Sequence, residues 1–231
     1  MWLTLACILL ALIAYPVHSA WRAIQGMYTS LRPYHMAYAM HNYHDTHRQL
    51  PPAVIYDDNG DPMHSWRVLI LPFIEESRCY EGYDLQQPWN SPANDARCRA
   101  TTIAKRLFAS TEAWNTDQHC TNFVVIRGPG TMFEDGKALN FKDLEEPSET
   151  VMLVEIPASD IAWHEPRDLD IRTMSFQLND PTKPCVGNAR GNGANVAFAD
   201  CSIVQLKNST TPEELRAMIT IADDGDARPN D

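Results

Sequence analysis

Residues 21–48 read WRAIQGMYTSLRPYHMAYAMHNYHDTHR, and the pattern in this stretch decides the fold that we expect. The segment before it, residues 1–20, carries no Lys, Arg, Asp or Glu. A membrane-inserting stem over 1–20 that continues into an amphipathic helix over 21–48 is therefore predicted. The apolar side chains that recur at helical spacing are Trp21, Ile24, Met27, Tyr28, Leu31, Tyr34 and Tyr38.

Three accounts of the stem stay open. The apolar stretch before Pro16 has the length of a signal-peptide core, and Val17-His18-Ser19 offers small residues that signal peptidase accepts. The uncharged run also reaches Trp21, which gives about the 20 residues that a spanning helix needs. A wrongly placed start codon that has removed a basic leader is the third account.

The stem sets the expected location, which is the cell envelope. The chain is either membrane-anchored with an extracytoplasmic domain or secreted after signal cleavage. Arg22 and Arg32 follow the apolar core and no basic residue precedes it, so the charge bias argues weakly against an external body.

The composition indicates one acidic domain after the stem. A chain of 231 residues with 44% hydrophobic side chains can bury a core over 21–231. Its net charge of -11 opposes binding to a phosphate backbone, which depends on clustered Lys and Arg. We expect no nucleic-acid partner.

The cysteines form no C-x-x-C pair of the kind that indicates zinc binding or thiol redox chemistry. One or two disulfides are expected if the body is exported, with a thiol left over. The sequence leaves their connectivity open. The six positions are Cys7, Cys79, Cys98, Cys120, Cys185 and Cys201.

Short strands and long loops are expected over residues 49–210. Leu50-Pro51-Pro52 ends the helical pattern, because proline supplies no amide hydrogen and disfavours helix in its predecessor. The expected elements are a buried strand or short helix at 65–76, a helical stretch at 96–107, strands at 121–126 and 150–156, and surface loops over 157–193.

The pattern is clearest near the C-terminus. Strands at Ala194–Phe198 and Ser202–Leu206 are joined by Ala199-Asp200-Cys201 as a tight hairpin. Thr211-Pro212-Glu213-Glu214 then starts a short helix over 211–221 with a capping box. The predicted fold class is α+β, with a long N-terminal helix packed on an antiparallel β-sheet.

A set of short motifs occurs in a fixed order from the end of the helix to the hairpin. Together these motifs resemble the large bacterial family of pilin-like proteins of unknown function, which have a prepilin-type N-terminal cleavage and methylation segment and a C-terminal H-x(9)-D-G motif. The motif residues are His41, Asn42, Tyr43, His44, Asp45, Trp66, Arg67, Pro88, Trp89, Asn90, Trp163, Gly193, Ala194, Asn195, Phe198 and Asp200.

The resemblance implies a pilin-like or pseudopilin-like architecture without catalytic activity. It also implies two kinds of partner, the membrane through the stem and other pilin-like or secretion-system subunits. The chain departs from the family in lacking a Gly-Phe-Thr-Leu-Ile-Glu processing site, in Arg190 at the motif histidine and in Cys201 at the final glycine. A positive φ at that hairpin position costs a residue with a side chain about 1–2 kcal/mol.

One candidate metal site lies at the end of the predicted helix. His41 and His44 stand three residues apart, with Asp45 beside them, so two imidazoles could share an ion. In the alternative interpretation this is a polar helix end, where His41 and His44 hydrogen-bond to the loops they meet. We favour the second interpretation because no third ligand is evident, and we expect no metal.

Two acidic features have ordinary explanations beside functional ones. Asp57, Asn59 and Asp61 alternate like the start of a calcium loop, but Val68 stands where such a loop needs its bidentate Glu. Glu155 ends a strand and is either a functional carboxylate or a group that caps the sheet edge. An acidic turn and a structural carboxylate are expected.

Four tryptophans are candidates for stacking on sugar rings, although large aromatic side chains commonly lie in a core. The sequence contains no G-x-S-x-G elbow and no nucleotide-binding glycine loop. We expect no enzyme and no cofactor. The tryptophans are Trp66, Trp89, Trp114 and Trp163.

The expected function is that of a non-enzymatic pilin-like subunit at the cell surface or in a secretion machine. A membrane-anchored binding module for glycans is the alternative. A metal-assisted hydrolase built on the histidine cluster is the third hypothesis.

Overall fold

The computed structural model describes residues 31–109, 119–157 and 159–221. Within these ranges the fold is α+β and its largest sheet is antiparallel. The predicted stem, residues 1–20, lies outside them. None of the helices that the described ranges contain is long and apolar enough to span a bilayer.

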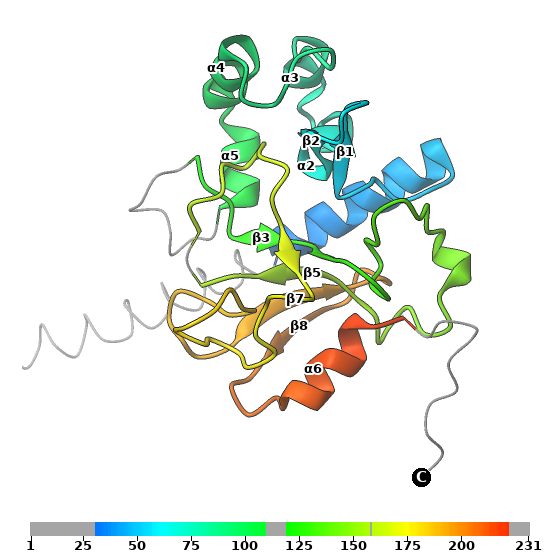
Figure 1. Cartoon of the computed structure of the whole chain (residues 1–231), viewed down its shortest axis with the longest axis vertical. Helices are drawn as coiled ribbons and strands as arrows, with labels where there is room; N and C mark the ends of the chain where they lie inside the picture. Colours follow the sequence, from blue (N-terminus) through cyan, green and yellow to red (C-terminus); the bar gives the residue numbers. More distant parts are fainter. Residues whose placement is uncertain (1–30, 110–118, 158, 222–231) are drawn as a thin grey trace, which may run out of the picture.

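A four-stranded sheet in the order β3-β5-β7-β8 forms the centre of the molecule (Figure 1). Its middle strands are wholly buried, so both faces of the sheet are covered. The strands are β3 (Phe123–Val124), β5 (Val151–Glu155), β7 (Ala194–Phe198) and β8 (Ile203–Leu206).

Alternate residues of these strands enter two different hydrophobic clusters. Leu153 and Ala197 belong to one cluster together with Met36 and Met40 of the helix at residues 31–47. The intervening side chains on the other face pack with α6 (Pro212–Ile219). Helix 31–47 and α6 therefore cover opposite faces of the sheet (Figure 1).

The pilin-like fold predicted from the sequence, with a long N-terminal helix laid on an antiparallel sheet, is wrong. The helical residues described at this end run from 31 to 47, and no long N-terminal helix is shown. Apolar side chains at helical spacing over 21–48 indicate an amphipathic face but do not set the length of the helix that carries it. Residues 21–30 of that prediction lie outside the described ranges.

Helical segments that the resemblance did not imply follow in the next part of the chain. Along the chain they lie between the small hairpin of β1 (Val54–Tyr56) and β2 (Pro62–Ser65) and the first strand of the central sheet. The segments are α2 (Trp66–Leu69), η1 (Leu71–Phe73), α3 (Ser77–Glu81), α4 (Pro92–Ala100) and α5 (Ile103–Phe108).

Local capping explains why residues 65–76 become helical rather than extended. Ser65 has extended backbone angles, and its side chain accepts a hydrogen bond from the amide of Arg67 at 3.2 Å. Pro72 then stands at the start of η1, where a missing amide hydrogen costs nothing. The helical stretch expected at 96–107 is split into α4 and α5 at Thr101, which has extended angles.

The strand predicted at 121–126 is divided between two sheets. β3 pairs with β5, whereas β4 (Ile126–Arg127) pairs in parallel with β6 (Leu169–Asp170). The amide of Val125 donates to Asp168 Oδ1 at 3.0 Å, which takes this residue out of the sheet ladder. The side chain of Asp168, from a distant loop, thus causes the break between β3 and β4.

The hairpin and the last helix agree with the predictions. β7 and β8 pair in antiparallel register across Ala199-Asp200-Cys201, and Cys201 adopts a φ of 67° as expected for this turn. Thr211 and Glu214 form the predicted capping box at the start of α6. The short helix η3 (Phe141–Asp143) completes the elements.

The loops over 157–193 are not confined to the surface. Trp163, His164 and Met174 are buried, and Trp163 belongs to the core that also holds helix 31–47. This segment is rich in turn-forming residues, yet it places large side chains over the sheet edge and so contributes to the core.

Candidate functional site

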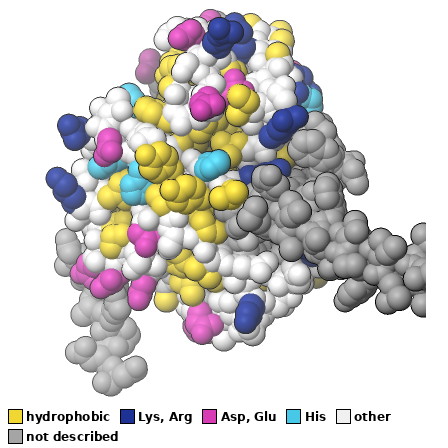
Figure 2. Space-filling model, turned by 180° about the vertical axis from the view of Figure 1, so that it is seen from behind, with side chains coloured by type: hydrophobic (Ala, Val, Ile, Leu, Met, Phe, Trp, Pro, Cys, Tyr) yellow, Lys and Arg dark blue, Asp and Glu magenta, His cyan; other side chains and the backbone are white. Residues whose placement is uncertain are grey.

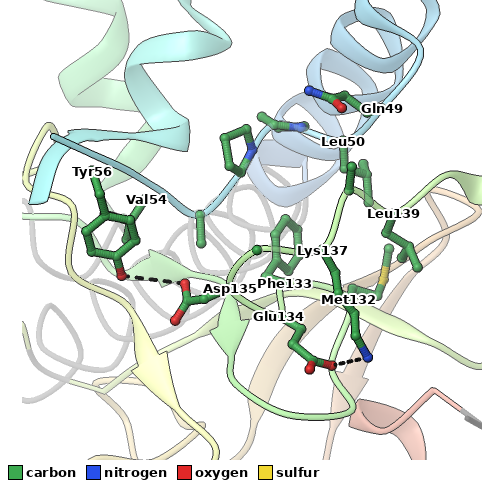
Figure 3. A pocket seen from close by; sticks show the side chains of 15 residues that line it. Gln49, Leu50, Val54, Tyr56, Met132, Phe133, Glu134, Asp135, Lys137 and Leu139 are labelled. Atoms are coloured by element: carbon green, nitrogen blue, oxygen red, sulfur yellow. Dashed lines mark hydrogen bonds and ion pairs between the residues drawn. The ribbon is translucent and has the colours of Figure 1, made fainter. Parts of the chain in front are cut away.

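A groove opens between the segment that leaves helix 31–47 and the loop at residues 132–139 (Figure 3). Its volume is about 230 Å³. β1 forms one wall, and the amide of Leu50 donates to Leu139 O at 3.1 Å to hold the two walls together. Its side chains include Leu50, Pro51, Pro52, Tyr56, Met132, Phe133, Glu134, Asp135, Lys137 and Leu139.

The charged groups at the groove are paired with one another. Arg127 donates through Nη2 to the Tyr56 hydroxyl and to Asp135 Oδ2, both at 2.7 Å. Burial opposes the charge of Arg127, but Asp135 and Tyr56 outweigh it and raise the pKa of the guanidinium. Lys137 Nζ lies 3.0 Å from Glu134 Oε2.

The charged side chains of the lining are held by partners. The described residues around the groove include no Ser, Thr, Cys or His, and Glu134, Asp135 and Lys137 are engaged in ion pairs. The backbone amide of Gly130 and the Lys137 side chain lower the pKa of Glu134. A carboxylate held in its charged form by these partners is poorly placed to act as a general acid.

The motif residues Trp66 and Arg67 do not reach the groove but enter the core. Both side chains and that of Asp168 are fully buried, and Arg67 Nη2 lies 2.6 Å from Asp168 Oδ1. The same carboxylate oxygen accepts from Trp66 Nε1 at 3.1 Å. Arg67 also donates to the carbonyl of Phe123 through Nε and Nη2, at 3.2 and 3.0 Å.

Burial acts against both members of this ion pair. It lowers the pKa of Arg67 and raises the pKa of Asp168, while the charge of each partner opposes that change. The hydrogen bonds to Phe123 and Val125 tie α2 and the loop before β6 to the central strands. The Trp66-Arg67 motif is therefore a structural clamp.

The motif tryptophans Trp89 and Trp163 meet at a buried histidine. Their rings lie 5.6 and 5.3 Å from the ring of His164, which is 1% exposed. Nε2 of His164 lies 3.4 Å from Asp95 Oδ1, an ion-pair distance rather than that of a well-formed hydrogen bond. Burial lowers the pKa of His164 to about 4, and Asp95 only partly compensates.

Pro88 and Asn90, which flank Trp89 in the Pro88-Trp89-Asn90 motif, are exposed. They stand on the loop between α3 and α4. The amide of Trp89 donates to Met63 O at 3.0 Å, and the side chain of Asn94 donates to Pro88 O at 3.1 Å. These bonds fix the loop against β2 and α4.

The histidine cluster has the contacts of a polar helix end. His41 Nε2 lies 2.7 Å from Ala199 O in the hairpin, and its ring stacks on Phe141 at 3.9 Å. His44 Nδ1 lies 3.6 Å from Asp45 Oδ1. Nowhere in the described ranges do three or more His, Cys, Asp or Glu side chains come together as metal ligands would.

Asn42 and Tyr43 complete this first motif in different surroundings. Tyr43 is buried in the cluster that contains the core face of helix 31–47, whereas Asn42 is half-buried, and its carbonyl accepts from the Thr46 hydroxyl. The motif therefore joins the helix to the core and to the hairpin turn.

The C-terminal motif residues shape β7 and its hairpin. Gly193 has a φ of 144°, and a Cβ there would lie 2.1 Å from the carbonyl oxygen of Leu206. Asn195 donates through its amide and its side chain to Glu155 Oε2, at 3.1 and 2.6 Å. Asp200 Oδ1 accepts from the amide of Ser202 at 2.8 Å. Ala194 and Phe198 are buried.

The other sequence candidates also have structural explanations. Asp57 Oδ1 accepts from the amides of Asn59 and Asp61, at 2.9 and 2.8 Å, which makes the acidic segment a hairpin turn between β1 and β2. Glu155 is buried and bonds across to β7. Trp66 and Trp163 are core residues, Trp89 is half-buried, and Trp114 lies outside the described residues.

Sequence reasoning missed the groove. Tyr56, Arg127 and Asp135 come from three segments, and single-sequence patterns carry no signal that brings such distant positions together. Arg127 directly follows the predicted strand 121–126 and precedes the Gly128-Pro129-Gly130 turn. Only this position, at the end of a predicted strand, hinted at a role for Arg127.

Comparison with known proteins gives one match. The model of a family described as "Protein of unknown function (DUF1559)" matches residues 34–146, just under half of the chain. The matched region contains the His41–Asp45, Trp66-Arg67 and Pro88-Trp89-Asn90 motifs and the groove, but not the C-terminal motif. No curated protein and no solved structure matches.

Proposed function

We propose that this chain is a non-catalytic, pilin-like subunit of the cell surface or of a secretion machine, which acts by contact with other envelope proteins. The observation that carries the proposal is the outer face of helix 31–47. Leu31, Tyr34 and Tyr38 are 40%, 41% and 54% exposed there. Their spacing places them on one side of the helix.

The two faces of this helix have different roles. Met36 and Met40 are fully buried against the sheet, so the core accounts for one face only. On the other face the rings of Tyr34 and Tyr38 stack 6.2 Å apart. Aromatic side chains exposed in a row are typical of protein contact surfaces.

The position of this face in the chain supports the same function. It belongs to the helix that follows the uncharged segment 1–20, which we propose holds the chain at the membrane. Helix 31–47 lies behind the sheet in Figure 1 and so faces the viewer in Figure 2, where hydrophobic side chains are gathered with histidines among them.

Position-specific photo-crosslinking in cells that produce the protein tests this function. We expect p-benzoylphenylalanine in place of Tyr38 to give crosslinked species, and the same probe in place of Val204 to give none. Val204 is the matched control because it is 43% exposed and lies on β8. Monomer alone at position 38 would contradict the proposal.

A ligand-binding module is the second candidate function, and the groove favours it. Tyr56 is 40% exposed beside the carboxylate of Asp135, a combination of ring face and hydrogen-bond acceptor that suits a sugar. A glycan array probed with the wild type and with Tyr56→Ala tests it. We expect hits that the variant loses, and an array without hits removes this candidate.

A further inference from the structure

Two cysteines from separate helices meet inside the small helical part of the fold. Cys79 lies in α3 and Cys98 in α4, and they are 5% and 0% exposed. α3 and α4 stand beside each other at the end of the molecule farthest from α6 (Figure 1). Both cysteines belong to one hydrophobic cluster.

The two thiols lie near enough to interact. Hydrogen bonding between them is the largest cause of the change in the pKa of each. This bond lowers the pKa of Cys79, whereas the same bond together with burial raises the pKa of Cys98. One sulfur is thus favoured as a thiolate, and the other holds the proton.

Side chains of α4 pack against the end of α3 and against the loop between the two helices. The guanidinium of Arg97 in α4 lies over Gly82, where an added Cβ would come within 1.8 Å of it. The side chain of Asn94 donates to the carbonyls of Asp84, Gln87 and Pro88, which closes the loop between the helices.

Cys185 is a third buried cysteine, and its thiol has a different kind of partner. The thiol of Cys185 donates to the carbonyl oxygen of Asp180 at 3.4 Å. Burial raises the pKa of this thiol. Cys185 has a backbone partner where Cys79 and Cys98 have each other.

We infer that Cys79 and Cys98 form a disulfide in the mature protein, which locks α3 to α4 and clamps the loop that carries Pro88-Trp89-Asn90. The inference rests on the position of two interacting, buried thiols on neighbouring helices. The presence of an oxidant depends on the proposed envelope location, because protein thiols are oxidised outside the cytoplasm and kept reduced within it.

The reaction is a dithiol–disulfide exchange with a donor disulfide, such as that of a thiol oxidoreductase or of glutathione. The Cys79 thiolate attacks one donor sulfur, which forms a mixed disulfide and releases the first donor thiol. Cys98 loses its proton and attacks the sulfur of Cys79, which releases the second. Two protein thiols are oxidised and one donor disulfide is reduced to two thiols.

The bond would fix a short helix to its neighbour. α3 is five residues long and has no side-chain cap. Closure of the segment between the two cysteines restricts the unfolded chain, and we expect oxidation to raise the melting temperature by roughly 6–12 °C.

The test is mass spectrometry of the native protein, alkylated before lysis and digested without reduction. We expect one peptide pair joined through Cys79 and Cys98, two hydrogens lighter than the sum of its parts, while Cys185 is alkylated after unfolding. Refolding of the purified protein with glutathione disulfide should give the same pair. Cys185→Ser should keep it, and Cys98→Ser should lose it together with the shift in melting temperature.

Alkylation of both Cys79 and Cys98 when the protein is unfolded without reduction would overturn the inference, as would a link from either residue to another cysteine. The outcome is separable from that of the proposed function. A reduced pair in protein from the envelope fraction removes the disulfide alone, whereas a linked pair in an exported monomer removes the assembly proposal alone.

Discussion

Arg67 and Asp168 bring two opposite charges into the interior, where each depends on the other. Both side chains are fully buried, and their closest atoms are 2.6 Å apart. Removal of one member of such a pair leaves an uncompensated charge, which costs about 3–5 kcal/mol. Replacement of both by apolar side chains of similar volume can restore the loss.

The first prediction is a double-mutant cycle on this pair. Arg67→Met alone should lower the free energy of unfolding by about 3–5 kcal/mol, because it leaves Asp168 buried without its counter-charge. Arg67→Met with Asp168→Leu should lose less than the sum of the single changes. Urea denaturation measures all four proteins, and strictly additive losses would show that the two groups are not coupled.

The second prediction concerns His164, whose pKa burial lowers from 6.5 to about 4. A buried neutral histidine binds fewer protons than in the unfolded chain, so stability is complete above pH 6.5 and falls as the pH drops toward 4. The total loss is about 3 kcal/mol.

The measurement for His164 is the difference in unfolding free energy between wild type and His164→Leu at several pH values. We expect this difference to shrink as the pH falls from 6.5 to 4 and to be constant above pH 7. A difference independent of pH would mean that His164 keeps an ordinary pKa in the folded protein.

At the scale of elements, the sequence predicts those whose signals are local. The β7–β8 hairpin and the capping box of α6 depend on neighbouring residues, and the structure has both. The break at Val125 depends on Asp168 from a distant loop, so hydrophobic patterns missed it. They left residues 65–76 open between a strand and a short helix, and the Ser65 cap accompanies the helix. No long N-terminal helix is shown, because the helical residues described at this end run from 31 to 47. Apolar side chains at helical spacing indicate an amphipathic face but do not set the length of the helix.

The candidate site also depends on contacts between segments that are distant in the sequence. Half of the motif positions prove to be buried, among them Trp66 and Trp163, which support the core. Tyr56 and Asp135 of the groove meet Arg127 only after folding. Contacts between such distant segments cannot be predicted from one sequence.

The third prediction tests the close approach of β8 to the start of β7. Gly193→Ala would place a Cβ 2.1 Å from the carbonyl oxygen of Leu206, a backbone atom held in the sheet, and should cost about 3 kcal/mol or more. Gly191→Ala is the control, because that glycine has a φ of 66° and open space around it. We expect about 1–2 kcal/mol for the control, and equal losses would argue against the steric cause.

The fourth prediction isolates the strain in the hairpin turn. Cys201 has a φ of 67°, which glycine adopts without a steric penalty. Cys201→Gly and Cys201→Ala both remove the sulfur, but only the first relieves the backbone. The glycine variant should be more stable than the alanine variant by about 1 kcal/mol in thermal unfolding. The reverse order would show that the turn is relaxed with a side chain present.

At the scale of the whole molecule, the described chain is an α+β domain whose sheet is covered on both faces. The helix on one face keeps an exposed row of Leu31, Tyr34 and Tyr38 that the domain itself does not use. The family match covers this helix from residue 34. Assembly through this exposed row is the role that we propose for the molecule.

The measurement that tests this claim most directly is fractionation of native cells after chemical crosslinking, with mass spectrometry of the N-terminal peptide and of crosslinked peptides. We predict that the protein is recovered from the membrane fraction with segment 1–20 retained in full or in part, and that helix 31–47 is crosslinked to another envelope subunit. Recovery as an exported monomer that lacks this segment and carries no crosslinks would contradict the account.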